Sequence, residues 1–379
     1  MLVVSLLLFT IVCILLIERS AVQRSVDHLP LRIHVNGTRG KSSVTEYIAA
    51  GLYHAQPEVM AKITGIIPTI IHNGEKRTIA RAGGARVQEQ FNMIRLAAKK
   101  KVNSLVLECM SISPELQRLE SRYFQPHIYV ISNIRDDHRE EMGNNIEEQA
   151  GSICNAIPEN CTVITNEIRF LDKIKETASL KNSLVISPKE LHPDFLIGLP
   201  FGVFPENVQL ALAVCGAAGV NDQVAKEGIM KCLSNFQSPL SMVTHDSKEI
   251  TFLNAFAVND VDSTDRFIHH WQTNTGKKEN ISVILNTRTD RPIRTDLFAG
   301  WIAQNSSTIN TVIVTGNHVN RAKYFMLQAG IDKQKIVVWR KKQIANLKAS
   351  LFNAVSDQSF VVGIGNIQGV GFKVISEMR

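Results

Sequence analysis

The residues with the clearest chemistry form the short segment VNGTRGKSS at positions 35–43. Gly37 and Gly40 allow a tight turn that brings backbone N–H groups close to an anion. Lys41 adds a mobile positive charge, and Ser42 offers a hydroxyl oxygen to a magnesium ion held between phosphates. A full GxxxxGK[ST] loop begins with glycine, but valine stands at that place here. The segment is therefore a shortened P-loop.

The flanking residues predict a strand before this loop and a helix after it. Leu31, Ile33 and Val35 alternate with polar residues, as in a strand with one buried face. Positions 44, 48, 52 and 55 are apolar and lie on one face of a helix, whose positive N-terminal end points at the loop. A glycine turn before an ordinary capped helix would explain each feature alone. Their combination favours phosphate binding.

Length and composition predict a globular protein with two domains. The 379 residues are 44% hydrophobic and 20% charged and contain no repeat. The formal charge of +7 suits an anionic substrate or a lipid surface, whereas scattered basic residues without interleaved aromatics argue against nucleic acid. The six cysteines have no CxxC spacing, which indicates free thiols in a reducing compartment, with neither a zinc site nor disulfides.

The N-terminal run at positions 2–17 is apolar except for Ser5 and Thr10. As a helix it is ~24 Å long, at the short end for the ~30 Å hydrocarbon core of a bilayer. We favour an uncleaved membrane anchor over a signal peptide, because no Lys or Arg precedes the run and no A-x-A site follows it. A buried core helix is a third interpretation. Arg19 and Arg24 come directly after the run and predict that the rest of the chain is cytoplasmic.

The rest of the chain alternates β-branched runs with helical patterns, which indicates βαβ units and mainly parallel sheets. The predicted strands are 104–109, 127–134 and 161–166, followed by 281–287, 311–315, 335–339 and 360–364. Residues 236–250 are polar and aperiodic, which predicts a hinge between the two series.

We therefore expect an α/β protein in three parts. Residues 1–20 form the transmembrane anchor, residues 27–240 a P-loop-type ATP-binding domain around a parallel sheet, and residues 245–379 a smaller Rossmann-like α/β domain.

Polar residues follow several predicted strands, at the edge where α/β proteins bind ligands. Glu108 ends the strand 104–109 and either binds Mg²⁺ or is an ordinary solvated carboxylate. His138 follows the next strand within NIRDDH, where a metal ligand, a phosphate contact and a helix cap all remain open. Asn207 lies near the start of the predicted helix FPENVQLALAV, where it is either a functional amide or a plain N-cap.

Three polar loops follow strands of the second domain. Their sequences are VNDVDST at 258–264, NTRTDR at 286–291 and GIGNIQGVG at 363–371. Each alone is an ordinary loop, but together they predict a surface that faces a bound anion.

In combination these motifs resemble a known family. GTRGKSS, the strand-end Glu108, NIRDDH, Asn207-x-x-Leu-Ala, VNDVDST and NTRTDR occur in the order seen in the Mur ligases and folylpolyglutamate synthase, which are ATP-dependent amide ligases. The chain resembles more closely the ligase subunit of bacterial poly-γ-glutamate synthase. The shared phrases are NGTRGKSSVT, ECMSISPELQ, DDHREEMG, NAFAVNDVDST, NTRTDR and GIGNIQG, together with a membrane helix where Mur ligases carry a substrate-binding N-terminal domain.

The resemblance implies roles for individual residues. The ATP phosphates are expected to contact Gly37, Thr38, Arg39, Gly40, Lys41, Ser42 and Ser43. Ser42 and Glu108 are expected to bind one Mg²⁺, with Mn²⁺ as an alternative, and His138 to help bind a second ion. Asn207 is expected at the adenine, and the residues expected at the nucleotide and acyl phosphate from the second domain are Asp260, Arg288, Asp290 and Arg291. The catalytic set is Lys41, His138, Asp260 and Arg291.

The implied activity is ATP-dependent polymerisation of glutamate into poly-γ-glutamate for a capsule or surface polymer. The reaction passes through an acyl phosphate and releases ADP and phosphate. Expected partners are glutamate, the growing polymer and a small polytopic membrane subunit at the cytoplasmic membrane, with a homo-oligomer left open. The alternatives are a membrane-tethered ligase acting on another acidic substrate, and an ATP-driven energiser or scaffold for polymer export.

Overall fold

The computed structural model describes residues 2–65, 67–81, 83–137, 139–258, 260–275 and 281–378. The chain divides into two compact units, unit 1 at Met1–Phe236 and unit 2 at Gln237–Arg379. The division lies at the start of the segment 236–250, for which the sequence predicts a hinge. From Leu240 onward that segment forms instead an antiparallel hairpin of β9 (Leu240–His245) and β10 (Lys248–Asn254). Most β9 side chains are partly or fully exposed, so the strand lacks the alternation that reveals a buried face.

Unit 1 is built on an eight-stranded sheet in the order β4-β3-β2-β5-β1-β6-β7-β8. Its strands are β1 (Leu31–Asn36), β2 (Val59–Ile63), β3 (Thr69–His72), β4 (Glu75–Thr78), β5 (Ser104–Glu108), β6 (Ile128–Ile131), β7 (Thr162–Thr165) and β8 (Leu184–Ile186). All pairings are parallel except in the β2-β3-β4 segment. The central strand β1 therefore has parallel neighbours on both sides, and the carboxyl ends of β5, β1 and β6 meet at one edge.

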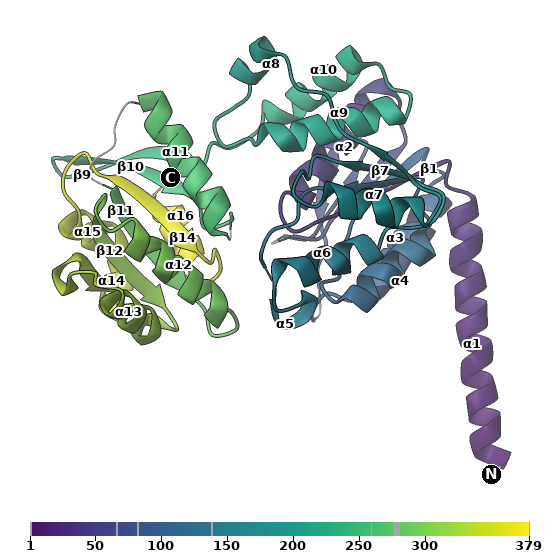
Figure 1. Ribbon diagram of the computed structural model, residues 1–379, viewed down its shortest axis with the longest axis horizontal. Coiled ribbons are helices and arrows are strands. Elements are labelled where there is room, and N and C mark those ends of the chain that lie inside the picture. The colour runs from purple at the N-terminus through teal and green to yellow at the C-terminus, as the bar shows by residue number, and fades with distance from the viewer. Residues whose placement is uncertain are drawn as a thin grey trace. The chain divides into compact units, whose positions relative to one another are not determined.

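Helices cover both faces of this sheet (Figure 1). They are α1 (Leu2–Asp27), α2 (Lys41–Ala55), α3 (Gln88–Lys99), α4 (Pro114–Phe124), α5 (Arg139–Met142), α6 (Ile146–Asn155), α7 (Leu171–Ser179), α8 (Pro193–Ile197), α9 (Pro205–Ala217) and α10 (Asp222–Leu233). One buried cluster joins the sheet to α2, α9 and α10, and clusters on the other face join it to the end of α1, α3, α6 and α7.

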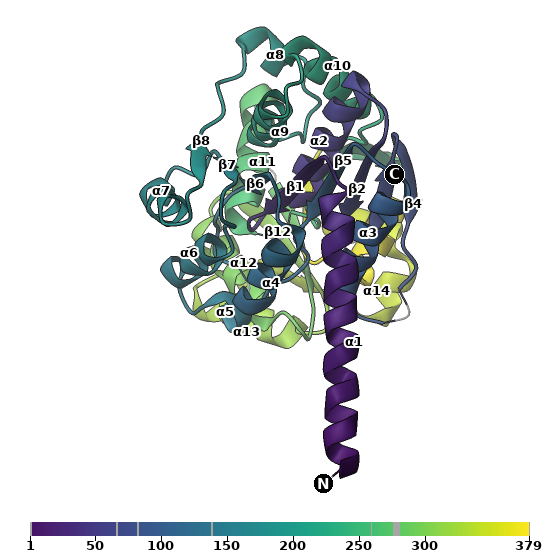
Figure 2. The same ribbon diagram turned by 90° about the vertical axis from the view of Figure 1, so that its right-hand side faces the viewer.

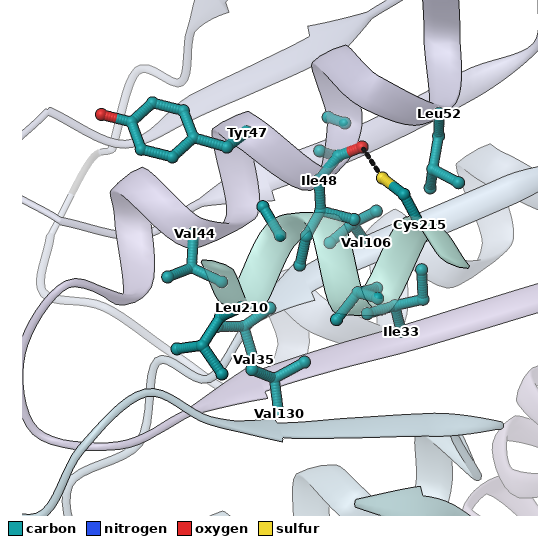
Figure 3. Packing of buried hydrophobic residues seen from close by; sticks show 14 of the residues in the cluster. Ile33, Val35, Val44, Tyr47, Ile48, Leu52, Val106, Val130, Leu210 and Cys215 are labelled. Atoms are coloured by element: carbon teal, nitrogen blue, oxygen red, sulfur yellow. Dashed lines mark hydrogen bonds between the residues drawn. The ribbon is translucent and has the colours of Figure 1, made fainter. Parts of the chain in front are cut away.

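The packing of α2 against β1 follows from the alternation seen in the sequence. Figure 3 shows Ile33 and Val35 of β1 among Val44 and Ile48 of α2 and Leu210 of α9, and all five are fully buried. Leu52, the next predicted position of the helix face, is also buried, whereas the last position, residue 55, is exposed because it ends α2. This packing fixes the start of α2 directly behind the loop at 37–40.

The helix α1 has an exposed apolar part and a buried end. Of the described residues, one helix is long and apolar enough to cross a membrane, namely Val3–Asp27 with a hydropathy of 2.2. Figure 2 shows α1 leaving the rest of its unit as one continuous helix. The predicted anchor ends near residue 20, but the helix continues to Asp27, and Val22 and Val26 are buried against α3 and the sheet.

Unit 2 has a six-stranded sheet in the order β13-β12-β11-β14-β10-β9. The remaining strands are β11 (Ile281–Thr287), β12 (Ile309–Gly316), β13 (Ile336–Val338) and β14 (Phe360–Gly365). Its helices are α11 (Val261–Thr275), α12 (Pro292–Gln304), α13 (Val319–Gln328), the 3₁₀ helix η1 (Lys333–Lys335), α14 (Lys341–Ala345), α15 (Leu347–Ala354) and α16 (Val370–Glu377).

The strands of unit 2 pair in parallel except β9, which is antiparallel to β10. One face of the sheet packs against α15 and α16 in a single buried cluster. All three tryptophans of the chain, Trp271, Trp301 and Trp339, are buried in this unit. The predicted α/β fold with parallel sheets and an apolar N-terminal helix is confirmed.

Candidate active site

The loop between β1 and α2 has a backbone that only glycine fits at two positions. Gly37 and Gly40 have φ angles of 122° and 78°, in the region that disfavours residues with a Cβ. A Cβ at Gly37 would lie 2.3 Å from the Ser132 Oγ, and one at Gly40 would lie 2.6 Å from the Asn207 Oδ1. The two glycines therefore set the turn and let the loop pass close to its neighbours.

The segment that follows β6 holds this loop in place. The Thr38 N–H donates to the Asn133 carbonyl oxygen at 2.9 Å, and the Arg39 N–H donates to the Asn133 Oδ1 at 3.0 Å. The Ser132 hydroxyl donates to the Arg39 carbonyl oxygen at 2.6 Å. At the other end of the loop, the Asn36 Oδ1 accepts from the Gly37 N–H at 2.7 Å. The loop is thus preorganised before any ligand arrives.

The start of α2 is arranged as an anion site. Among the described residues, no side chain caps this helix terminus, so none of them neutralises the positive end of the helix dipole as a capping group. The Lys41 ammonium folds back over the loop and donates to the Gly37 carbonyl oxygen at 2.6 Å. Backbone N–H groups, a helix N-terminus and a lysine together favour a phosphate group.

Ser42 and Glu108, which the sequence predicts to share a metal ion, lie in contact. The Ser42 Oγ is 3.1 and 3.0 Å from the two carboxylate oxygens of Glu108. The strand register explains this, because Val35 of β1 pairs with Glu108 of β5. The Glu108 side chain is buried and also accepts from the Thr64 N–H at 2.7 Å. A hydroxyl and a carboxylate are the oxygen ligands that Mg²⁺ prefers, so the pair fits that ion.

The thiol next to this carboxylate is poorly suited to act as a nucleophile. Cys109 is fully buried, and burial raises the pKa of its thiol well above the usual value. A covalent thioester route therefore has no support at this position.

The NIRDD segment closes one side of the loop. Arg39 and Asp137 form an ion pair with a nitrogen–oxygen distance of 2.8 Å, and both side chains are largely buried. The Arg135 N–H donates to the Thr38 Oγ1 at 3.1 Å. His138, expected as a metal ligand, lies outside the described residues.

Asn207 does not cap a helix. Phe204 is the N-cap residue of α9, and Asn207 is the third residue of that helix. Its buried amide lies against Gly40. The structure therefore brings Asn207 to the phosphate loop, and the N-cap interpretation is wrong.

The predicted residues of unit 2 lie at its strand ends, where local contacts engage several of them. The Asp260 Oδ1 accepts from the Ser263 N–H at 2.8 Å and so caps the start of α11. Arg288 donates to both carboxylate oxygens of Asp290, at 2.9 and 2.7 Å. Arg291 is the N-cap residue of α12.

Two of the three polar loops of unit 2 meet, and Asn286 joins them. Its side-chain amide donates to the carbonyl oxygens of Asn366 and Gln368, at 2.5 and 2.9 Å. The Arg294 guanidinium donates to the Asn366 Oδ1 at 3.0 Å. The loops after β11 and β14 thus form one surface. The sequence predicts both loops, with Asn286 in the motif NTRTDR, but it indicates neither the joining role of Asn286 nor the contact of Arg294.

Two family descriptions match successive parts of the chain. Residues 35–192 match the Mur ligase middle domain, and residues 240–379 match the poly-gamma-glutamate synthase CapB C-terminal domain. Among curated relatives, the capsule biosynthesis protein CapB of Bacillus anthracis is 28% identical over 94% of this chain and 78% of its own length. The PGA synthase CapB of Bacillus subtilis (strain 168) is 27% identical over 96% of this chain and 94% of its own.

Solved structures share the fold at low sequence identity. E. coli FolC in complex with ADP superposes with a TM-score of 0.70 at 15% identity, covering 95% of this chain and 93% of that one. The bifunctional folylpolyglutamate synthase/dihydrofolate synthase of Yersinia pestis, complexed with AMPPNP and a Mn ion, has a TM-score of 0.67 at 14% identity, covering 94% and 92%. The resemblance to Mur ligases and to the poly-γ-glutamate synthase ligase subunit, predicted from the motifs, is confirmed.

Proposed function

We propose that this chain, which is an ATP-dependent amide-bond-forming ligase of the Mur type, polymerises glutamate into poly-γ-glutamate through an acyl-phosphate intermediate. The assignment of the substrate rests on the match of residues 240–379 to the CapB C-terminal domain. Relatives named for capsule and PGA synthesis support it, because the similarity extends over nearly the whole chain.

The need for ATP follows from the chemistry of the substrate. A carboxylate is a poor electrophile, so the γ-carboxylate at the end of the polymer first attacks the γ-phosphorus of ATP. This step forms an acyl phosphate and releases ADP. The amine of an incoming glutamate then attacks the acyl carbon, and phosphate leaves as the amide forms.

The residues of the β1–α2 loop have defined tasks in this scheme. The loop N–H groups and the Lys41 ammonium bind the phosphates and offset their charge during transfer. Ser42 and Glu108 would hold Mg²⁺, which when bound neutralises charge on the phosphate oxygens. We assign His138 to a second ion on the resemblance alone.

The other assigned residues complete the nucleotide site in this proposal. Asn207 contacts the adenine, and its position against Gly40 supports a place beside the nucleotide. The residues assigned to the nucleotide and acyl phosphate from unit 2 are Asp260, Arg288, Asp290 and Arg291. For Asp260 and Arg288 this requires that a ligand compete with the local contacts at Ser263 and Asp290.

We place the protein at the cytoplasmic membrane, with α1 as a single-pass anchor and both units in the cytoplasm. The exposed apolar surface of α1 and the positive charges of Arg19 and Arg24 support this orientation. A small polytopic membrane subunit is the proposed partner, because a short apolar helix gains stability by packing against other helices.

The test is incubation of membranes containing the protein with radiolabelled glutamate and ATP. We expect a polymer that a γ-glutamyl hydrolase degrades and an ordinary protease does not, with one ADP and one phosphate released per glutamate incorporated. AMP and pyrophosphate as products would refute the mechanism. ATP consumption without incorporation would favour an export energiser, and incorporation only with another acidic acceptor would change the substrate.

A further inference from the structure

A set of buried polar side chains lies on the face of the unit 1 sheet opposite to α2. Ile33 and Val35 face α2, so the alternation of β1 turns His34 and Asn36 to the other face. There they meet Gln117 and Glu120 of α4, and all four polar side chains are no more than 2% exposed. Buried polar groups are costly unless they are fully hydrogen-bonded, so their partners are informative.

Glu120 is bonded to the turn that directly follows Glu108. Its carboxylate accepts from the Met110 N–H at 3.2 Å, from the Ser111 N–H at 2.9 Å and from the Ser111 hydroxyl. The His34 Nε2 lies 3.5 Å from the same carboxylate. One carboxylate thus anchors the backbone two and three residues after the proposed metal ligand.

Gln90 of α3 connects Glu120 to the backbone of Glu108 itself. Its side-chain N–H₂ donates to the Glu120 Oε2 at 2.9 Å and to the Glu108 carbonyl oxygen at 2.8 Å. The orientation of the amide is fixed, because its Oε1 accepts from the buried Lys62 ammonium at 3.1 Å. Lys62 is in turn 3.3 Å from Glu89.

The same face also supports the phosphate loop. The Asn36 amide, whose oxygen accepts from the Gly37 N–H, donates to the Gln117 Oε1 at 2.9 Å and to the Tyr129 hydroxyl at 2.7 Å. Gln117 donates to the Ile112 carbonyl oxygen at 2.7 Å. The loop after β1 and the turn after β5 are therefore both bonded to α4.

His34, Cys109 and Glu120 are residue types that bind transition metals, and their ligand atoms lie within 4.8 Å of one another. Both Glu120 carboxylate oxygens already accept hydrogen bonds from protein donors, and these bonds explain why the carboxylate is buried without requiring a metal.

We propose that Glu120 and Gln90 are positioning residues that hold the Glu108–Ser111 backbone so that the Glu108 carboxylate faces Ser42, and thereby set the affinity of the phosphate site for its divalent metal. The proposal rests on the function proposed above only through the assignment of Glu108 as a metal ligand. Removal of a group that hydrogen-bonds to a metal ligand typically changes the metal affinity by about 10–100-fold.

The test measures Mn²⁺ binding to the full-length protein in detergent, with AMPPNP present, from the electron paramagnetic resonance signal of free Mn²⁺. Glu120→Gln keeps the shape but turns an NH₂ group toward N–H donors, and Gln90→Met keeps the length but removes the donor. We expect each variant to bind Mn²⁺ about 10-fold more weakly than the parent. ADP affinity measured in EDTA should change less than about twofold, because the loop and Lys41 remain in place.

Two controls separate this role from general loss of structure. Ser152→Ala removes buried hydrogen bonds to the Met142 and Glu148 carbonyl oxygens, away from Glu108, and should leave Mn²⁺ affinity unchanged. If Ser152→Ala weakens Mn²⁺ binding as much as the test variants do, the inference fails. If Glu120→Gln does not fold, the Mn²⁺ affinity of Gln90→Met is the measurement that decides whether the inference holds.

Glu108→Gln distinguishes failure of the inference from failure of the proposed site. If Glu108→Gln binds Mn²⁺ like the parent, the metal assignment itself is wrong. If Glu108→Gln weakens binding and both Glu120→Gln and Gln90→Met match the parent, the assignment of Glu108 stands and only the positioning role is overturned.

Discussion

Removal of residues 1–27 should destabilise unit 1, whereas removal of residues 1–17 should not. Residues 3–17 lie outside the core, and the apolar stretch of α1 that is long enough to cross a membrane is not buried in the protein. Val22 and Val26 differ, because they are 1% and 0% exposed and belong to the cluster formed with α3 and β5. The end of α1 is therefore part of the folded unit.

The size of the effect follows from the buried surface. Burial of a valine side chain contributes about 1.5–3 kcal/mol, so loss of both removes roughly 3–6 kcal/mol as an upper estimate. The Arg32 guanidinium also loses the Val26 carbonyl oxygen, which accepts from it at 3.1 Å. A domain is typically stable by about 5–15 kcal/mol, so the loss is a large share of the total. Val26→Ala alone should cost about 2 kcal/mol.

Urea unfolding can assign the effect to one unit. All three tryptophans lie in unit 2, so their fluorescence follows unit 2, whereas far-UV circular dichroism follows both units. The protein 28–379 should lose part of its dichroism at a urea concentration about 1–2 M lower than the protein 18–379, for a slope of about 3 kcal/mol/M. The fluorescence transition should stay in place. Superimposable dichroism curves, or an equal shift in fluorescence, would refute this account of α1.

Three further perturbations test the site and the buried face. Gly40→Ala should weaken ADP binding at least about 10-fold in calorimetry, since the left-handed backbone costs an alanine about 1–2 kcal/mol and its Cβ would meet Asn207. The control is Gly219→Ala, which has the same backbone cost at a φ of 84° but open space around it. This control variant should bind ADP as the parent does. Lys41→Met should lower the rate of ADP release about 100-fold in a protein that unfolds at the parent temperature, and a rate near the parent's would remove Lys41 from the mechanism. For Glu120, burial alone would raise the pKa, but hydrogen bonds from His34 and other donors lower it below the usual 4.5. Its stabilising contribution is therefore complete above pH 4.5 and is lost as the pH falls further, so Glu120→Gln should flatten the dependence of unfolding free energy on pH below about 4.5. Parallel profiles for parent and variant would contradict that sign.

The strands that sequence patterns locate are the buried parallel ones. The strand β11 matches its predicted bounds at Ile281–Thr287, because every one of its residues is buried and most are apolar. The strand β2 and the hairpin of β3 and β4 were not predicted. The residues of β4 are all exposed, so nothing in the sequence EKRT marks a strand. Its conformation follows from its pairing with β3.

In the site, the contacts that can be predicted from the motifs differ from those that depend on the packing of distant elements. The contact of Ser42 with Glu108 is implied by the family resemblance, and the strand register agrees with it, because Glu108 at the end of β5 pairs with Val35 of β1, and Ser42 lies at the start of the helix that follows β1. Gln90 and Glu120 could not, since their contacts with the turn after β5 depend on how α3 and α4 pack against the sheet. No periodicity in those helices distinguishes a buried glutamate from a solvated one.

The exposed strand β4 has a consequence for the proposed attachment of the protein to a membrane. Copies held by α1 would meet one another in a plane at high local concentration, where an open strand edge invites strand-to-strand association. One of the two edges of the unit 1 sheet is β4, and its charged residues Glu75, Lys76 and Arg77 are all exposed. Lys76 is tied by an ion pair to Glu46 of α2. A short, charged edge resists pairing with another chain, so copies crowded on a membrane surface should not associate through β4.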